Sequence, residues 1–168
     1  MNTILYVLFT RYRSCDVPKG ESFAKRSTAH DRLGEWSRNA VLEKIKRRFL
    51  ELAQLHGAIN WERASVDGSF SPRESCGKDV DHGYKGKGST IHLLVDGEGM
   101  PLAETTTAAN GSEGDQVIKL INSVKINCGE GRPKSCPKEL QGDKAYDSQE
   151  LRNEIRKKGV KPIIARRV

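Results

Sequence analysis

The first third of the chain has the hydrophobic spacing of helices. From residue 28 to residue 57, apolar side chains recur mostly at steps of three and four, which places them on one face of a helix. The pattern predicts two or three short helices, with Ser37 as the N-cap of the strongest part. An earlier apolar run, residues 4–9, predicts a buried helical segment. The apolar residues of the longer region are Leu33, Trp36, Ala40, Val41, Ile45, Phe49, Leu52 and Leu55.

After Trp61 the pattern changes to that of strands. Residues 63–70, RASVDGSF, are apolar in their centre and predict a strand that ends at Asp67 and Gly68. A polar loop is predicted from residue 71 to residue 88. Residues 90–95 and 101–108 flank the turn sequence DGEG at 96–99, and this arrangement predicts a β-hairpin.

The last third of the chain alternates helices and strands. Residues 114–124 and 148–158 predict helices, residues 139–143 and 160–165 predict strands, and residues 127–138 predict a loop. Strands that alternate with helices require parallel crossovers, whereas the hairpin supplies antiparallel strands. The predicted fold class is therefore α/β, a mixed sheet flanked by helices and preceded by a small helical region.

Composition and charge narrow the class of protein. Of the 168 residues, 36% are apolar and 30% charged, which is typical of a globular protein. No apolar run approaches the roughly 18 to 20 residues that cross a bilayer. The net charge of +7 favours contact with a polyanion such as nucleic acid. The four cysteines form no CxxC pair, so we expect reduced thiols in a cytoplasmic protein.

Two aspartates are candidates for chemistry. Asp67 and Asp143 each fall where a predicted strand gives way to a turn. If the two strands are central neighbours, the carboxylates meet at one edge of the sheet and repel each other unless a cation lies between them. Carboxylate oxygens suit Mg²⁺ or Mn²⁺, which can support phosphodiester chemistry. The alternative is structural, because Asp-Gly is a common turn pair and Asp143 could cap the following helical segment.

Other polar residues have simpler interpretations. Asp96 belongs to the hairpin turn, and Asp115 complements the dipole of a predicted helix. The tract GYKGKGS at residues 83–89 lacks the spacing of a nucleotide-binding loop. Its lysines could instead hold a DNA backbone or simply be solvated, and the helices before residue 57 could form either a helix-turn-helix or a plain bundle. The candidate DNA-binding lysines are Lys78, Lys85 and Lys87.

Three separated motifs resemble the DDE transposases of bacterial insertion sequences, of family five and the related family four. They are VDGSF at residues 66–70, KGKGSTIHLLVDGEGMPLAETTTAANGSEGDQ at 85–116, and LQGDKAYDSQELRNEIRKKGVKPIIARR at 140–167. The resemblance implies a partial helical DNA-binding region at 1–60 and a ribonuclease-H-like catalytic domain at 61–168. It implies that Asp67 and Asp143 are the first and second catalytic acids and ligands of Mg²⁺ or Mn²⁺. Double-stranded DNA, as terminal inverted repeats and target, is the implied partner, with a possible homodimer.

The sequence departs from this family in three places. The family's third acid is a glutamate on a helix beyond the strand that ends near Arg166, whereas this chain stops at Val168. A helical segment that usually precedes ILYVL is missing, and Thr90 replaces the commoner lysine. We therefore expect a fragment with little strand-transfer activity. The alternative is a non-catalytic, DNA-binding remnant that interferes with a full-length transposase.

Overall fold

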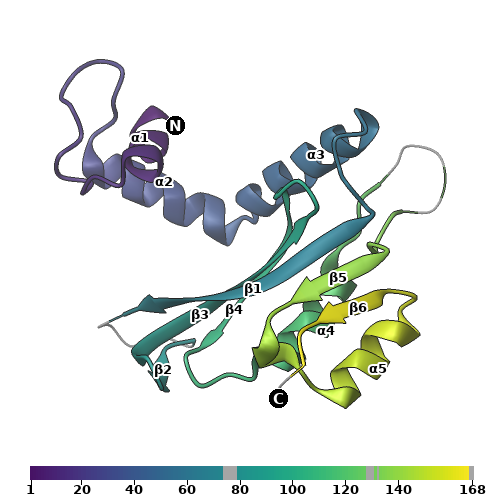
Figure 1. Cartoon of the computed structure of the whole chain (residues 1–168). Coiled ribbons are helices and arrows are strands. Elements are labelled where there is room, and N and C mark those ends of the chain that lie inside the picture. The colour runs from purple at the N-terminus through teal and green to yellow at the C-terminus, as the bar shows by residue number, and fades with distance from the viewer. Residues whose placement is uncertain (74–78, 128–130, 132, 167–168) are drawn as a thin grey trace. The chain divides into compact units, whose positions relative to one another are not determined.

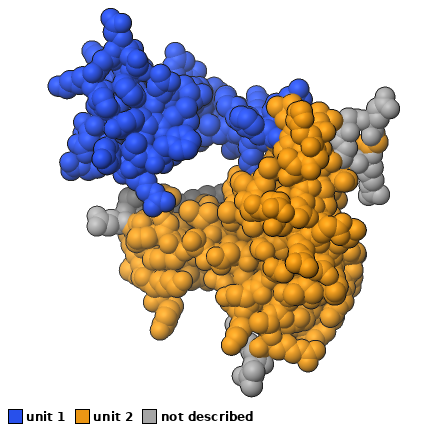
Figure 2. Space-filling view, turned by 45° about the horizontal axis from the view of Figure 1, so that its top comes forward, with its two compact units in different colours: residues 1–49 blue, residues 50–168 orange. Residues whose placement is uncertain are grey.

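The chain divides into two compact units in a computed structural model that describes residues 1–73, 79–127, 131 and 133–166. The units comprise residues 1–49 and 50–168 (Figure 2). Within the described residues, no helix is long and apolar enough to cross a membrane. The second unit contains the whole sheet and both candidate aspartates.

The first unit is helical. Helix α1 runs over Asn2–Thr10, α2 over Arg26–Arg38, and α3 over Val41–Leu55, continuing into the second unit. The Thr3 hydroxyl donates to the Ala24 carbonyl across 3.1 Å, which ties α1 to the segment before α2. Tyr6 contacts Phe23 edge-on with ring centroids 5.5 Å apart.

Two predictions for this region were wrong in detail. The apolar run at residues 4–9 is helical, but Leu8 and Phe9 are 68% and 84% exposed. A unit of 49 residues has too little apolar surface to enclose every such side chain. Ser37 lies inside α2 and is not an N-cap, because the break between α2 and α3 falls at Ala40, whose φ is 52°.

The described residues of the second unit form one six-stranded mixed sheet (Figure 1). Its strands are β1 (Arg63–Pro72), β2 (Asp81–Gly83), β3 (Gly86–Asp96), β4 (Pro101–Ala108), β5 (Glu139–Gly142) and β6 (Lys161–Ile164). The order is β2-β3-β1-β5-β6, and β4 also pairs with β3. The β1–β3 and β3–β4 pairs are antiparallel, whereas β1–β5 and β5–β6 are parallel. The predicted mixed sheet with flanking helices is confirmed.

Strand β1 is longer than the sequence predicted. It continues past Asp67 and Gly68 to Pro72, because β3 pairs with it from Asp96 back to Gly88. Short strands also occupy part of the predicted polar loop at residues 71–88: β2 and the start of β3 form a small hairpin. Asp67 therefore lies within a strand and not at its end.

The core lies on one face of the sheet, where α4 (Glu113–Ser123) and α5 (Gln149–Lys157) pack. Along β1, Ala64 and Val66 are buried, whereas Asp67 between Val66 and Gly68 is exposed. This alternation is expected of a strand with one covered face. The same cluster contains Val117, Leu120, Ile121, Leu140, Leu151 and Ile155.

Candidate metal centre

The parallel pairing of β1 with β5 sets the distance between the two candidate acids. Ser65 is the register partner of Gln141, so paired positions differ by 76 in number. Carrying this offset two residues further, 67 + 76 = 143, puts Asp67 level with Asp143. Neighbouring strands lie about 4.8 Å apart. Alternation along β1 puts Asp67 on the face of Ser65, whose side chain is hydrogen-bonded to that of Gln141 at 3.5 Å, and Asp143 directly follows the last residue of β5. Continued past the last paired residues, the register thus places these two aspartates, called the aspartate pair, at a common level. The charges of both act on the buried Tyr146 hydroxyl.

Each member of the aspartate pair is exposed and oriented by a backbone N–H. Oδ1 of Asp67 accepts from the Gly68 amide at 2.8 Å. Oδ1 of Asp143 accepts from the Ala145 amide at 2.8 Å and caps the short 3₁₀ helix η1 (Lys144–Tyr146). The capping role that the sequence left open for Asp143 is therefore real. It engages one of two carboxylate oxygens, and a carboxylate can accept several partners, so capping and cation binding are compatible.

A buried polar layer lies under Gly68. A Cβ at this position would be 3.4 Å from both the Tyr146 hydroxyl and His92 Nδ1. Tyr146 is 2% exposed and His92 is fully buried, and neither of these two atoms has a hydrogen-bond partner. Nε2 of His92 pairs with the Thr107 hydroxyl at 2.9 Å. A Cβ at position 68 would thus be in van der Waals contact with both groups, which places them directly beside β1.

The electrostatics of this layer keep both groups neutral. Burial raises the pKa of Tyr146, and the charges of Glu113 and of the aspartate pair raise it further. Burial lowers the pKa of His92. A neutral phenol and a neutral imidazole can donate or accept hydrogen bonds without adding charge beside the aspartate pair.

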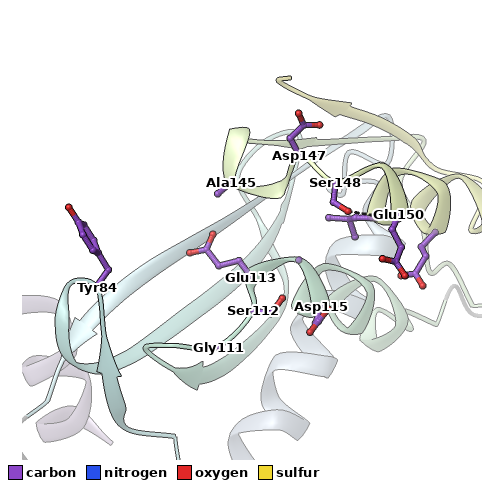
Figure 3. Close-up of a pocket in the computed structure, with 12 residues that line it drawn as sticks. Tyr84, Gly111, Ser112, Glu113, Asp115, Ala145, Asp147, Ser148 and Glu150 are labelled. Carbon is purple, nitrogen blue, oxygen red and sulfur yellow. Dashed lines mark hydrogen bonds between the residues drawn. The ribbon is translucent and has the colours of Figure 1, made fainter. Parts of the chain in front are cut away.

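Two cavities meet at the N-terminus of α4. One, of about 900 Å³, lies between the beginnings of α4 and α5 (Figure 3). Its lining comprises Tyr84, Gly111, Ser112, Glu113, Gly114, Asp115, Ala145, Asp147, Ser148, Glu150, Leu151 and Glu154. The other, of about 230 Å³, is lined by Gly68, Phe70, Tyr84, Lys85, Thr90, Ala109 and Glu113. Tyr84 and Glu113 are common to both, so the cavities are neighbours.

The remaining candidate residues are distributed differently. Lys85 lies in the β2–β3 turn and lines the smaller cavity, and Lys87 lies in β3 opposite His82. Lys78 lies outside the described residues. Asp96 is buried in the hairpin turn: Oδ1 accepts from the amides of Glu98 and Met100, and Oδ2 from that of Asn60. Its structural role is thereby confirmed.

Sequence reasoning missed three residues near the aspartate pair, namely His92, Tyr146 and Glu113. The histidines showed no spacing typical of a site, Tyr146 lies in a short helical turn, and Glu113 resembles any acid at the start of a helix. Their proximity depends on strand pairing and helix packing, which bring together positions up to 78 residues apart (146 − 68 = 78). The one signal was Gly68 inside a strand, which often marks a close approach of another group.

A mixed sheet of this order, with helices packed against it, defines the class of the protein as α/β. Residues 62–167 match the model of the family described as Transposase DDE domain. The chain belongs to this family, the DDE transposases of bacterial insertion sequences, as the sequence motifs predicted.

Known proteins similar to the chain include a transposase and an integrase. The transposase assigned to insertion sequence element IS402 of Burkholderia cepacia is 36% identical over 81 residues, which are 48% of this chain. The match spans only 38% of that protein. The catalytic core domain of HTLV-2 integrase, solved in complex with magnesium, covers 64% of this chain and 61% of its own, with 14% identity and a TM-score of 0.43. The piggyBac transposase, solved in a synaptic complex with hairpin DNA, covers 66% and 24%, with 16% identity and a TM-score of 0.41.

Proposed function

We propose that this transposase-family chain binds double-stranded DNA at the ends of an insertion element and takes part in metal-dependent strand cleavage and strand transfer. The observation that supports the proposal is the parallel register of β1 and β5, which, continued past Gln141, brings Asp67 level with Asp143. In this proposal, residues 61–168 form the catalytic domain and residues 1–60 a partial DNA-binding region. The protein acts in the bacterial cytoplasm, associated with the nucleoid when bound to DNA, and as a homodimer.

The residues present fit a hydrated divalent cation. Asp67 and Asp143 offer hard oxygen ligands, which Mg²⁺ and Mn²⁺ prefer. Among the described residues, no three acidic, histidine or cysteine side chains are gathered closely enough to hold an ion directly. Mg²⁺ keeps several of its waters and is often bound by one or two carboxylates, so this donor set suits it.

A different element holds each aspartate in place for the proposed reaction. A divalent cation held by Asp67 and Asp143 would supply activation of the attacking oxygen and stabilisation of the leaving oxygen in an in-line displacement. Asp67, fixed in a strand paired on both sides, holds its carboxylate at a constant position. Oδ1 of Asp143 is held by the Ala145 amide at the start of η1, which fixes the carboxylate at the end of β5.

Basic residues near the aspartate pair support the proposed DNA contact. Lys85 is exposed in the turn beside the smaller cavity, and Lys87 follows two residues later. Lysines contact phosphates irrespective of sequence and so fix the register of a duplex. Lys78 belongs to the same proposed set. The net charge of +7 adds long-range attraction to DNA.

The test is Mn²⁺-dependent nicking of DNA that carries the ends of the element. Asp67→Asn and Asp143→Asn remove a charge without changing shape, and each should lower nicking at least a hundredfold. Asp31→Asn, on exposed helix α2, is the matched control and should leave the rate unchanged. Nicking that survives both substitutions would eliminate the aspartate pair as the catalytic centre.

The second candidate function is non-catalytic DNA binding that interferes with a full-length transposase. It needs only the basic residues and the net charge of +7, and no metal centre. Under this alternative the chain binds DNA and shows no nicking at any Mn²⁺ concentration. It also lowers the activity of an added full-length relative. A chain that fails to bind DNA even at low salt would contradict both functions.

A further inference from the structure

Tyr146 lies beneath two glycines that are sequence neighbours of the aspartate pair. Gly68 directly follows Asp67 on β1. Gly142 directly precedes Asp143 and is the last residue of β5. A Cβ at Gly142 would be 3.3 Å from Cδ2 of the Tyr146 ring, and a Cβ at Gly68 would be 3.4 Å from the Tyr146 hydroxyl. One buried side chain therefore reaches from β5 to β1, on the covered face of the sheet and opposite to the Asp67 side chain.

The position of Tyr146 agrees with the register of the two strands. Carried one residue past Gln141, the offset of 76 puts Gly142 level with Val66 (66 + 76 = 142). A Cβ at Gly142 would be 3.4 Å from Cγ1 of Val66, as this register requires. Tyr146 is 2% exposed and is among the largest fully buried side chains that the structure describes. Its ring therefore packs directly under the end of β5, where the strand runs beside β1.

The backbone on both sides of Tyr146 is anchored. Its amide donates to the Asp143 carbonyl at 3.3 Å, and its carbonyl accepts from the Ser148 amide at 2.9 Å. The next residue, Asp147, accepts from Nε and Nη2 of Arg152 at 3.0 and 2.7 Å. Arg152 is only 8% exposed, and breaking a buried ion pair by removing one partner is strongly destabilising. These contacts hold η1, and with it the tyrosine ring, in one place.

We propose that Tyr146 is a positioning residue of the metal centre: its ring sets the spacing of the two strand segments that carry Asp67 and Asp143. It acts through the backbone of Gly68 and Gly142 and touches neither the cation nor DNA. This inference rests on the proposed function, since it assumes that the aspartate pair binds a divalent cation. Neither the family match nor the sequence motifs assign Tyr146 a role.

The simpler interpretation of Tyr146 is a side chain that only fills the core. Under that interpretation, any core substitution that costs the same stability has the same effect on the metal centre. Leu102 is the matched control, because it is 3% exposed on β4, whose partner in the sheet is β3. Leu102→Ala leaves a cavity in the core away from the end of β5, whereas Tyr146→Leu leaves one directly under Gly142.

The experiment measures Mn²⁺ binding to the 168-residue chain by titration calorimetry without DNA. Residues that orient metal ligands typically contribute about 10- to 100-fold in affinity, so Tyr146→Leu should weaken Mn²⁺ binding about tenfold. Tyr146→Phe keeps the ring and should bind like the wild type. Its urea midpoint should stay equal or rise, because the variant removes an unpaired buried hydroxyl. Leu102→Ala should lower the urea midpoint and bind Mn²⁺ like the wild type.

Gly142→Ala tests the same contact from the other side and keeps the inference testable if Tyr146→Leu does not fold. Gly142 does not have the positive φ that would exclude alanine. The added methyl group would be 3.3 Å from the Tyr146 ring, so the ring and the end of β5 must move apart. Gly142→Ala should therefore weaken Mn²⁺ binding several-fold in a folded chain, and a urea titration of each variant confirms that it is folded.

The outcomes separate this inference from the proposed function. If the folded variants at Tyr146 and Gly142 bind Mn²⁺ as Leu102→Ala does, while Asp67→Asn abolishes binding, the positioning role is wrong and the metal centre stands. The role is also wrong if Tyr146→Phe loses as much affinity as Tyr146→Leu, because the ring would then not set the spacing. If Asp67→Asn and Asp143→Asn bind like the wild type, or the wild type binds no Mn²⁺, the metal centre and the inference fall together.

Discussion

At the scale of single residues, two aspartates have different roles because their surroundings differ. Asp96 lies in β3 and Asp67 in β1, and each is followed by a glycine. Asp96 is 2% exposed and accepts three backbone amides, so it stabilises the turn. Asp67 is exposed on the uncovered face and retains acceptor capacity for a ligand. Residue type and a neighbouring glycine therefore do not distinguish a structural aspartate from a candidate ligand. The number of hydrogen-bond donors around the carboxylate does distinguish Asp96 from Asp67.

Buried His92 makes the stability of the second unit depend on pH. Burial lowers its pKa below the unfolded value of about 6.5. As the pH falls below 6.5, the unfolded chain binds a proton that the folded chain resists, so the free energy of unfolding decreases. The urea midpoint should fall between pH 7.5 and pH 5.5, and His92→Gln should reduce that fall.

The control for this prediction is His30→Gln, because His30 is exposed in α2. It should leave the pH dependence as in the wild type. An equal dependence in His92→Gln and wild type would show that His92 is not the group responsible.

At the scale of elements, local pattern predicted helices better than strand lengths. Helix α5 was predicted at residues 148–158 and is found at Gln149–Lys157, because Ser148 caps it through the Leu151 amide and Gly159, at φ 77°, ends it. Strand β1 was predicted to end at Gly68 and continues to Pro72, because its partner β3 is long enough to pair with it. Helix boundaries depend on neighbours in sequence, whereas strand boundaries depend on a partner strand.

The packing of α5 gives a stability prediction. Ile155 is fully buried in the core against the sheet. Ile155→Ala removes three carbon atoms and leaves a cavity, which should lower the free energy of unfolding by about 2–5 kcal/mol. Urea denaturation measures this loss.

The matched substitution is Glu154→Ala, one residue earlier on the exposed face. It should change stability by no more than about 0.5 kcal/mol. Equal effects of the two substitutions would mean that α5 does not pack through Ile155.

At the scale of the whole molecule, charge gives a salt-dependence prediction. The chain carries 29 basic and 22 acidic residues, and phosphate contacts release counterions, so DNA affinity should fall steeply with salt. Each phosphate-binding lysine contributes about one unit to the slope of log K against log salt concentration. The double variant Lys85→Ala, Lys87→Ala should therefore lower the slope by about two units.

The control has the same charge change at another place. Lys157→Ala, Lys158→Ala removes two exposed lysines at the end of α5. Its slope should match the wild type when binding is followed by fluorescence anisotropy over a salt series. A larger loss in this control than in the first variant would place the DNA contact away from the β2–β3 turn.

The sequence by itself determined the class of fold, the sequence family and most helices, because these depend on hydrophobic period, turn residues and contiguous motifs. It also selected Asp67 and Asp143 as candidates. Tertiary structure decided the length of β1, the parallel pairing of β1 with β5 that sets the register of the two aspartates, and the burial of His92 and Tyr146 beside Gly68. These depend on strand register and helix packing, which join positions far apart in the chain and leave no periodic signal in the sequence.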